Sequence, residues 1–92
     1  MIKRIRHRGL SRFHATGETK GVNADNAAWL RILLTALDAA SSPAGLNFPG
    51  FGLHPLKGDR KGQWSVWVTK NVRLVFRFDG EDVTDLDMLD YH

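Results

Sequence analysis

The spacing of the apolar residues changes once along the chain, and this change constrains the fold more than any other feature. In the stretch NADNAAWLRILLTALDAASS, which begins at Asn23, the apolar residues recur every three or four positions: Ala27, Leu30, Leu33, Leu34, Leu37 and Ala40. This spacing predicts an amphipathic helix with one apolar face. Asn23 is a plausible N-cap, and Asp25 in the first turn would interact favourably with the helix dipole.

The Pro and Gly residues of the stretch SSPAGLNFPGFG predict an irregular loop. After this stretch, the apolar residues recur at every second position. In QWSVWVT, alternation predicts a strand with Trp64, Val66 and Val68 on one face and Ser65, Trp67 and Thr69 on the other. In VRLVFRF, it predicts a strand with Val72, Leu74, Phe76 and Phe78 on one face and Arg73, Val75 and Arg77 on the other. Lys70-Asn71 predicts a short turn and Asp79-Gly80 a hairpin, and a last strand would start near Val83.

The start of the chain adds two short elements. IKRIR, residues 2–6, could form an edge strand, and LSRFHATG suits a short helix that ends at Gly17. We therefore predict a single α+β domain over residues 1–92, with two N-terminal helices on one face of a small, mostly antiparallel sheet of four or five strands. The open face of that sheet would be basic and partly aromatic, which is typical of surfaces that bind RNA.

The bulk composition excludes several classes of protein. The chain has 92 residues and no cysteine, so disulfides and thiolate metal sites are excluded. No apolar run approaches the ~20 residues that a membrane helix needs, and the basic start lacks the apolar core of a secretory signal. We expect a cytoplasmic protein with no membrane partner and no cofactor. A metal site is also not expected, because the sequence has no HxH, HExxH or paired Cys, and His54, Asp90 and His92 would be a bare minimum of ligands.

The net charge of +3 conceals a strong segregation of charge. Residues 1–12 carry five bases and no acid, residues 54–77 carry six bases and one acid, and residues 79–90 carry six acids and no base. This pattern indicates either a side that faces a polyanion with an acidic flank opposite, or charged strand edges that prevent aggregation. Charge alone does not separate the two interpretations.

Two segments carry the residue types that RNA cleavage needs. In LHPLKGDRKGQW, His54 and Lys57 flank Pro55, and the following turn could hold a phosphate or be an ordinary exposed turn. The sequence ends in LDYH, so Asp90, Tyr91 and His92 are the last residues of the predicted strand, which runs from about Val83 to the terminus. His7 and His14 are interpreted as surface residues.

Cleavage of RNA without a metal needs a base for the 2′-hydroxyl, an acid for the leaving oxygen and cations for the transition state. His54, Asp90 and His92 could move protons, and histidine is suited to both roles. Lys57 and Arg73 could supply charge, and Tyr91 could stack on a base or donate a hydrogen bond. The hypothesis requires the ring of the last residue to lie beside residue 54. Candidate RNA-binding residues are Lys3, Arg4, Arg6, Arg60, Lys61, Trp67, Lys70 and Arg77.

Taken together, LHPLKG, the strand entry GQWSV and the terminal DYH resemble the HigB toxins, the proteic killer branch of the RelE/ParE superfamily of type II toxin–antitoxin systems. The resemblance spans essentially the whole chain. It implies a RelE-like, microbial-RNase-like sheet and a ribosome-dependent mRNA endonuclease that cuts codons in the A site. It also implies that His54, Lys57, Arg73, Asp90, Tyr91 and His92 occupy the family's active-site positions.

The resemblance further implies a HigA-like helix-turn-helix antitoxin as partner, and contact with operator DNA only through the complex of the two proteins. The chain departs from the pattern at Val72, where relatives commonly have an aromatic residue, and at Trp67, where they have a smaller or polar one. Trp67 could therefore be an added surface for stacking a base. Two other classes stay open at this point: a non-enzymatic toxin of the ParE type that binds a protein such as gyrase, and an RNA- or ribosome-binding module without chemistry.

Overall fold

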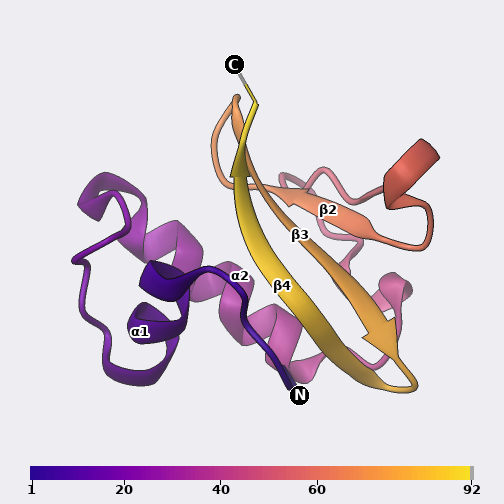
Figure 1. The fold of residues 1–92 in the computed structure, drawn as a ribbon, viewed down its shortest axis with the longest axis horizontal. Helices are drawn as coiled ribbons and strands as arrows, with labels where there is room; N and C mark the ends of the chain where they lie inside the picture. The colour runs from indigo at the N-terminus through magenta and orange to yellow at the C-terminus, as the bar shows by residue number, and fades with distance from the viewer. Residues whose placement is uncertain (92) are drawn as a thin grey trace.

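The fold is described from a computed structural model, which describes residues 1–91 of the chain. Helix α1 (Arg8–Thr16) and helix α2 (Ala27–Ala39) precede the strands β1 (His54–Pro55), β2 (Trp64–Trp67), β3 (Val72–Asp79) and β4 (Asp82–Asp90) (Figure 1). Three short 3-10 helices complete the order: η1 (Ala24–Asn26), η2 (Pro43–Leu46) and η3 (Gly58–Arg60).

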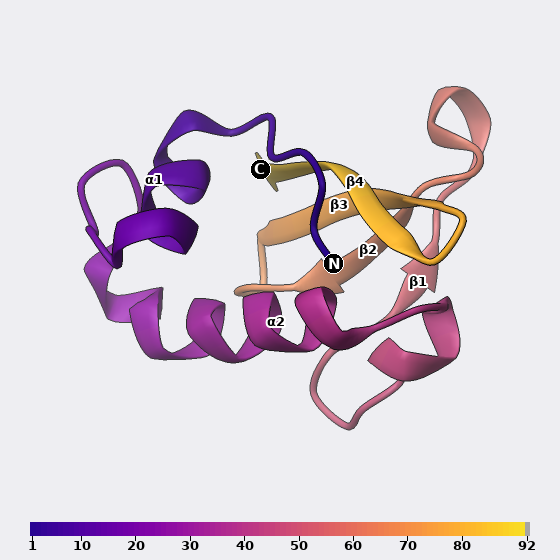
Figure 2. The same ribbon diagram turned by 90° about the horizontal axis from the view of Figure 1, so that it is seen from below.

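The strands form one antiparallel sheet in the order β1-β2-β3-β4. Both helices cover the same face of the sheet (Figure 2), and their leucines join the inward residues of the strands in one core. Leu33 and Leu37 of α2 are fully buried, as are Leu74 and Phe76 of β3. The predicted α+β class with two helices on one face of a small antiparallel sheet is confirmed, with four strands.

The N-terminal end of α2 differs from the prediction. Asn23 does cap the segment, since its side chain accepts a hydrogen bond from the Asp25 amide at 2.9 Å, but the first turn is the 3-10 helix η1. The α-helix begins only at Ala27, and its buried residues are those of the predicted apolar stripe. Gly17 ends α1 with a φ of 81°, which glycine adopts without strain, as the sequence predicted.

The N-terminal segment, residues 1–7, is called the N-terminal arm below. It was expected to form an edge strand, but it makes only two isolated parallel bridges, Ile2 with Val83 and Ile5 with Leu86. The Lys3 and Arg6 amides donate to carbonyls of β4, each at 2.7 Å. The arm therefore lies along the outer edge of β4, at the opposite edge of the sheet from β1.

Strand β4 contains a bulge that decides which of its later residues face the helices. The register with β3 shifts between Val75 and Arg77, and Asp85 at the shift has a φ of 51°, a left-handed conformation that Asp tolerates better than most residues. Beyond the bulge, Leu89 lies opposite Arg73 on the open face, whereas Asp90 lies opposite Val72. No helix within residues 1–91 is long and apolar enough to cross a membrane.

Candidate active site

A pocket of about 380 Å³ lies on the open face of the sheet, where β1, β2 and the end of β4 come together. We call it the His54 pocket, and its lining residues are Gly52, Leu53, His54, Leu56, Ser65, Trp67, Arg73 and Tyr91. Antiparallel pairing explains the set, because residues paired directly across strands point to the same side of the sheet. His54 pairs with Ser65, and Trp67 pairs with Arg73. The pocket thus gathers a histidine, an arginine and two aromatic side chains.

The floor of the pocket is more buried than the sequence suggested. Ser65 is only 5% exposed and Val75, its partner on β3, only 1%, although both belong to the face without helices. The exposed His54 stands beside this floor at the edge of the sheet. Ser65 was not among the predicted site residues, since a single serine in a strand gives no sequence signal, and only the cross-strand register identifies it.

Arg73 is fixed by the turn that precedes its strand. Its Nη1 donates to the carbonyl oxygens of Thr69 and Lys70, both at 2.7 Å, and its guanidinium carbon lies 5.5 Å from the centroid of the Trp67 ring. A guanidinium has five N–H donors, so these contacts leave others for a phosphate. Arg73 is therefore a pre-oriented cation at the side of the His54 pocket.

Trp67 stands between this arginine and a glycine. The ring is 48% exposed, which is unusual for a residue of this size. A Cβ placed on Gly52 would come within 2.3 Å of the indole, and Gly52 has a φ of 61°. Glycine is needed here both for the backbone conformation and for the close approach of the ring. Gly52 thereby leaves the space that the indole of Trp67 occupies.

Tyr91 brings the end of the chain to the pocket. Its amide donates to the carbonyl of Asn71 at 2.6 Å, which continues the pairing of β4 with β3 past Asp90. Its ring lines the His54 pocket and is 46% exposed. Of the predicted catalytic residues, the structure thus brings His54, Arg73 and Tyr91 together.

Lys57 and Asp90 do not line the His54 pocket. Lys57 follows β1 and lines a separate hollow at the β1–β2 turn, together with Lys61 and Trp64. Asp90 pairs with Val72, and the side chain of Val72 faces the core. Because side chains alternate along a strand, the side chain of Asp90 points away from the face that carries Arg73. The expected convergence of both residues with His54 on one face is not seen. His92, and with it the expected contact between its ring and His54, lies outside the described residues.

The lysines and arginines among the predicted catalytic and RNA-binding residues divide into two groups. Lys3 and Arg4 of the arm form ion pairs with Asp79 and Asp85 of the β3–β4 hairpin, at 3.1 and 3.2 Å, and Arg77 also contacts Asp85, at 3.4 Å. By contrast, within residues 1–91 no carboxylate pairs with the side chains of Arg6, Lys57, Arg60, Lys61, Lys70 or Arg73. Carboxylates of the β3–β4 hairpin therefore neutralise part of the arm. Within residues 1–91, they do not neutralise the cations of residues 54–73, which can contact RNA phosphates.

Two clear pKa shifts both belong to groups that hold the arm in place. The hydrogen bond with Asp79 and the attraction of its charge raise the pKa of the Lys3 ammonium. For Asp38 in α2, burial alone would raise the pKa, but hydrogen bonds from the His14 ring and the Ile2 amide lower it below its usual value. Neither group lies in the His54 pocket.

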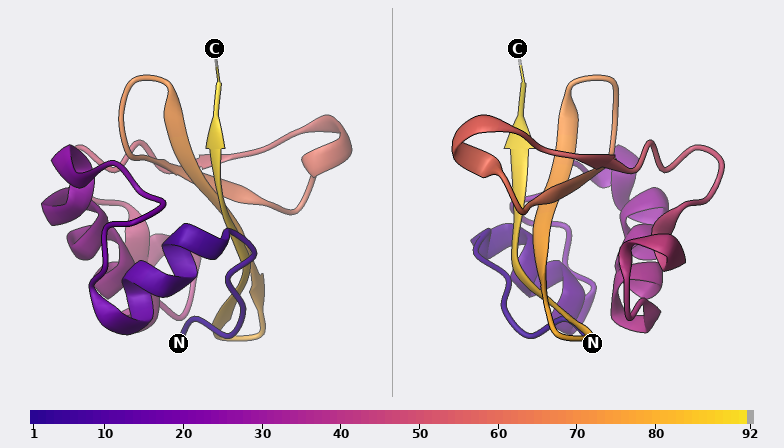
Figure 3. Two further views of the ribbon diagram at one scale, coloured as in Figure 1. Left: turned by 60° about the vertical axis from the view of Figure 1, so that its left-hand side comes forward. Right: turned by 90° about the vertical axis from the view of Figure 1, so that its right-hand side faces the viewer.

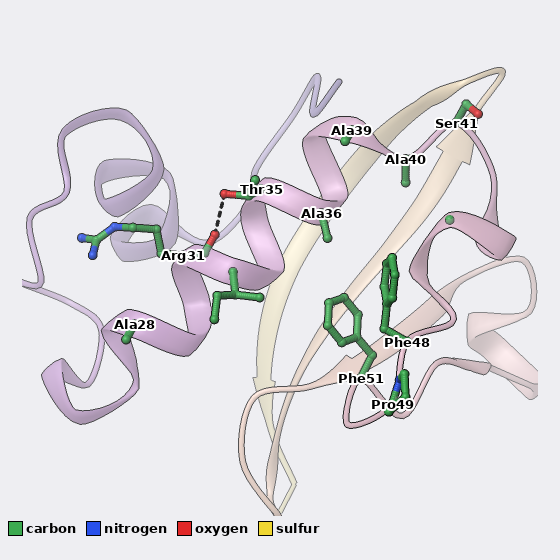
Figure 4. A pocket seen from close by; sticks show the side chains of 12 residues that line it. Ala28, Arg31, Thr35, Ala36, Ala39, Ala40, Ser41, Phe48, Pro49 and Phe51 are labelled. Atoms are coloured by element: carbon green, nitrogen blue, oxygen red, sulfur yellow. Dashed lines mark hydrogen bonds between the residues drawn. The ribbon is translucent and has the colours of Figure 1, made fainter.

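A larger hollow lies elsewhere on the described part of the chain. A groove of about 950 Å³ lies between α2 and the loop that follows η2, with Ile32 and Ala36 on the helix and Phe48 and Phe51 on the loop (Figure 4). Of the residues within 1–91 that line it, only Arg31 is titratable, and an arginine is not suited to acid–base chemistry. Among residues 1–91, no three side chains of His, Asp or Glu come together as a metal site would require. The chemistry that the residues allow is that of the His54 pocket.

Comparison with known proteins agrees with this fold and identifies the family. A family model described as the RelE-like toxin of type II toxin–antitoxin system HigB matches residues 3–92. The Endoribonuclease HigB of Proteus vulgaris is 41% identical over 92 residues, all of both chains.

Solved structures show the same fold at low identity. The YoeB–YefM complex from Staphylococcus aureus matches with a TM-score of 0.64 at 17% identity, and covers 100% of this chain and 98% of that chain. The YoeB/ParE toxin from Agrobacterium tumefaciens matches with a TM-score of 0.63 at 20% identity, covering 100% and 99%. Together with the full-length match to the family, these findings show that the chain belongs to the HigB family of RelE-like toxins of type II toxin–antitoxin systems.

Proposed function

We propose that this toxin, an endoribonuclease, cleaves mRNA on the ribosome, in the codon of the A site, by acid–base catalysis without a metal. The observation that carries the proposal is the His54 pocket, in which an exposed imidazole, a fixed guanidinium and two half-exposed aromatic rings surround a space of about 380 Å³. The full-length similarity to an endoribonuclease supports the reaction class. Work on translating ribosomes would also place the protein in the cytoplasm.

The residues of the pocket suit distinct parts of the reaction. His54 would exchange a proton with the 2′-hydroxyl or with the leaving 5′-oxygen. Arg73 would stabilise the additional negative charge on the phosphate, because the turn carbonyls already orient its guanidinium. Tyr91 would position the substrate by stacking on a base or donating its hydroxyl proton.

The remaining predicted catalytic residues stay part of the proposal with different roles. Lys57, at the rim beside the β1–β2 turn, would contact the RNA backbone, and so would Arg60 and Lys61. His92 would supply the second proton-transferring group, and Asp90, two residues before it in the sequence, would orient it. Figure 3 (left panel) shows the β1–β2 hairpin extending away from the helices, as a surface that enters a groove in RNA would need to.

As a toxin of a type II system, the protein has an antitoxin partner. We propose that this partner is a HigA-like helix-turn-helix protein, and that the toxin reaches operator DNA only as part of their complex. Co-expression with a HigA-like helix-turn-helix protein should restore growth and give a complex that co-purifies. Growth arrest that persists on co-expression, with no complex, would contradict this part of the proposal.

The experiment that tests the function is the mapping of message ends after controlled expression. Brief induction should produce new 5′ ends within the translated frames, and the same message with its start codon removed should stay intact. A purified reaction on programmed ribosomes should also proceed when EDTA is added to chelate metal ions. Magnesium is then kept just high enough to preserve the ribosome itself. Growth arrest with intact messages and an induced response to DNA damage would instead indicate a toxin of the gyrase-binding type.

A further inference from the structure

A second hollow adjoins the His54 pocket, and the two share a wall. This hollow, of about 400 Å³, is called the Lys70 pocket, and it is lined by Trp29, Gly50, Thr69 and Lys70 together with Trp67 and Arg73. Trp67 and Arg73 also line the His54 pocket, so this pair forms a ridge between the two spaces. A ridge of an indole and a guanidinium presents both a stacking surface and a positive charge.

The ridge is held rigidly from several sides. The Trp67 amide donates to the carbonyl of Phe51 at 2.7 Å, and its carbonyl accepts from the indole N–H of Trp29 at 2.9 Å. Gly52 lies directly against the ring, and the guanidinium of Arg73 is tied to the turn carbonyls of residues 69 and 70. An exposed aromatic ring that is already fixed loses little conformational entropy when a base stacks on it.

The Lys70 pocket also has the polar groups that a nucleotide needs. Lys70 is exposed, and within residues 1–91 no carboxylate pairs with it. The Thr69 hydroxyl oxygen accepts hydrogen bonds from the amides of Asn71 and Val72, at 3.3 and 3.1 Å. Its own proton is therefore left to be donated. Among residues 1–91, no carboxylate side chain lines this pocket, which favours an anionic occupant.

We propose that the Lys70 pocket is a subsite for the nucleotide next to the one in the His54 pocket. The base of this neighbouring nucleotide stacks on Trp67, and its phosphate lies between Lys70 and Arg73. The inference rests on the proposed function, and it adds a determinant of which RNA sequences are cut. Trp67 is a binding residue in this account, and Gly52 is a positioning residue that acts through it.

The test compares cleavage on ribosomes programmed with messages that carry an abasic nucleotide at successive positions around the cleavage site. With the wild-type toxin, one position beside the cleaved bond should raise the half-maximal toxin concentration roughly tenfold, in the range expected for one stacked base. Trp67→Leu should show the same loss on the intact message and no further loss on the abasic one. Lys70→Ala should weaken cleavage several-fold, and Lys20→Ala is the control for removing an exposed lysine elsewhere. Lys20→Ala should leave the half-maximal toxin concentration within about twofold of the wild type.

A matched pair of glycine variants separates the position of the indole from backbone strain. Gly52 and Gly80 have φ values of 61° and 62°, but a Cβ on Gly80 meets nothing within 4 Å. Gly52→Ala should behave like Trp67→Leu, with weaker cleavage of the intact message and no further loss on the abasic message. Gly80→Ala should behave like the wild type on both messages. Should Gly52→Ala fail to fold, the exposed Trp67→Leu still decides the question.

The inference is overturned if the wild-type toxin cleaves but no abasic position depends on Trp67, or if Trp67→Leu and Lys70→Ala cleave like the wild type. A wild-type toxin that cleaves no programmed message contradicts the proposed function itself, and the subsite falls with it. The two failures are therefore distinguishable.

Discussion

The N-terminal arm and the segment from His54 to Arg73 are both strongly basic, but their electrostatic surroundings are opposite. The arm lies along β4, at one edge of the sheet, and the segment begins with β1, at the other edge. In the arm, Lys3 and Arg4 are bound to carboxylates of the β3–β4 hairpin. In the segment, Arg73 is oriented by backbone carbonyls, and within residues 1–91 no carboxylate neutralises it. A run of basic residues therefore indicates an RNA surface only where the fold does not place acids beside it.

The largest expected effect concerns the histidines. His54→Ala should lower cleavage about a hundredfold or more, because a group that transfers a proton contributes at least that much. His14 is the matched control, since it lies in α1 and contacts Asp38, 2.8 Å away, far from the pocket. His14→Ala should leave the cleavage rate within about twofold when thermal melts show both variants folded. Equal activity of the two variants would contradict the assignment of the pocket.

Two arginines of β3 give the next comparison. Arg73→Ala should reduce cleavage on the order of a hundredfold, the usual loss for a missing donor to a developing charge. Arg73→Lys should remain impaired, since an ammonium cannot reproduce the planar fork. Arg77 lies on the same strand but contacts Asp85, so Arg77→Ala should cost less than about threefold. The rate of cleavage on programmed ribosomes is measured for all three variants. A larger loss of rate for Arg77→Ala than for Arg73→Ala would contradict the role assigned to Arg73.

The salt dependence of ribosome binding gives a smaller effect. Binding should weaken steeply with salt, because cations that contact phosphates release counterions. Lys57→Ala and Lys61→Ala should each reduce the steepness of log affinity against log salt by about one, which corresponds to the loss of one phosphate contact. Lys3→Ala should leave the slope unchanged, because Asp79 already binds Lys3. A flat response in the wild type, or an equal reduction for Lys3→Ala, would count against the 54–73 segment as the contact surface.

The smallest effect is on stability, at the contact that fixes the arm to the helices. Hydrogen bonds from His14 and Ile2 outweigh the burial that would raise the pKa of Asp38, and the net shift is downward. A carboxyl whose pKa is lower in the folded state stabilises the fold above its unfolded pKa, and this stabilisation is lost as pH falls through the folded pKa. Asp38→Asn should therefore lose stability near neutral pH, by less than about 1 kcal/mol for so exposed a group, and the difference from the wild type should vanish at acid pH. Urea denaturation from pH 2 to pH 7 measures this, and a difference that grows on acidification would contradict the sign.

The sequence predicted the elements whose signal is periodic. The stripe of α2 and the alternation of β3 are apolar patterns, and burial follows from them directly. The sequence did not predict the bulge at Asp85, because a left-handed Asp in a strand leaves no mark comparable to a glycine. That bulge decides which side chains at the end of β4 face the core and which face the open side of the sheet. The positions of Asp90 and Tyr91 relative to the pocket could therefore not be deduced.

The site was only partly predictable for a similar reason. His54, Arg73 and Tyr91 could be named from the chemistry of their side chains, and the fold brings them to one pocket. The roles of Ser65 and Gly52 depend on the cross-strand register and on the approach of an indole from another strand. Pairing of the arm with acids about eighty residues away depends on tertiary structure in the same way.

The most direct test of the central claim is to find which part of the toxin touches the message. A ribosome programmed with a photoreactive base in the A-site codon can be mixed with the inactive His54→Ala toxin, irradiated, and digested for mass spectrometry. The account predicts crosslinks to residues around the His54 pocket, at Trp67 and Tyr91. Crosslinks confined to the N-terminal arm, residues 1–7, would contradict it.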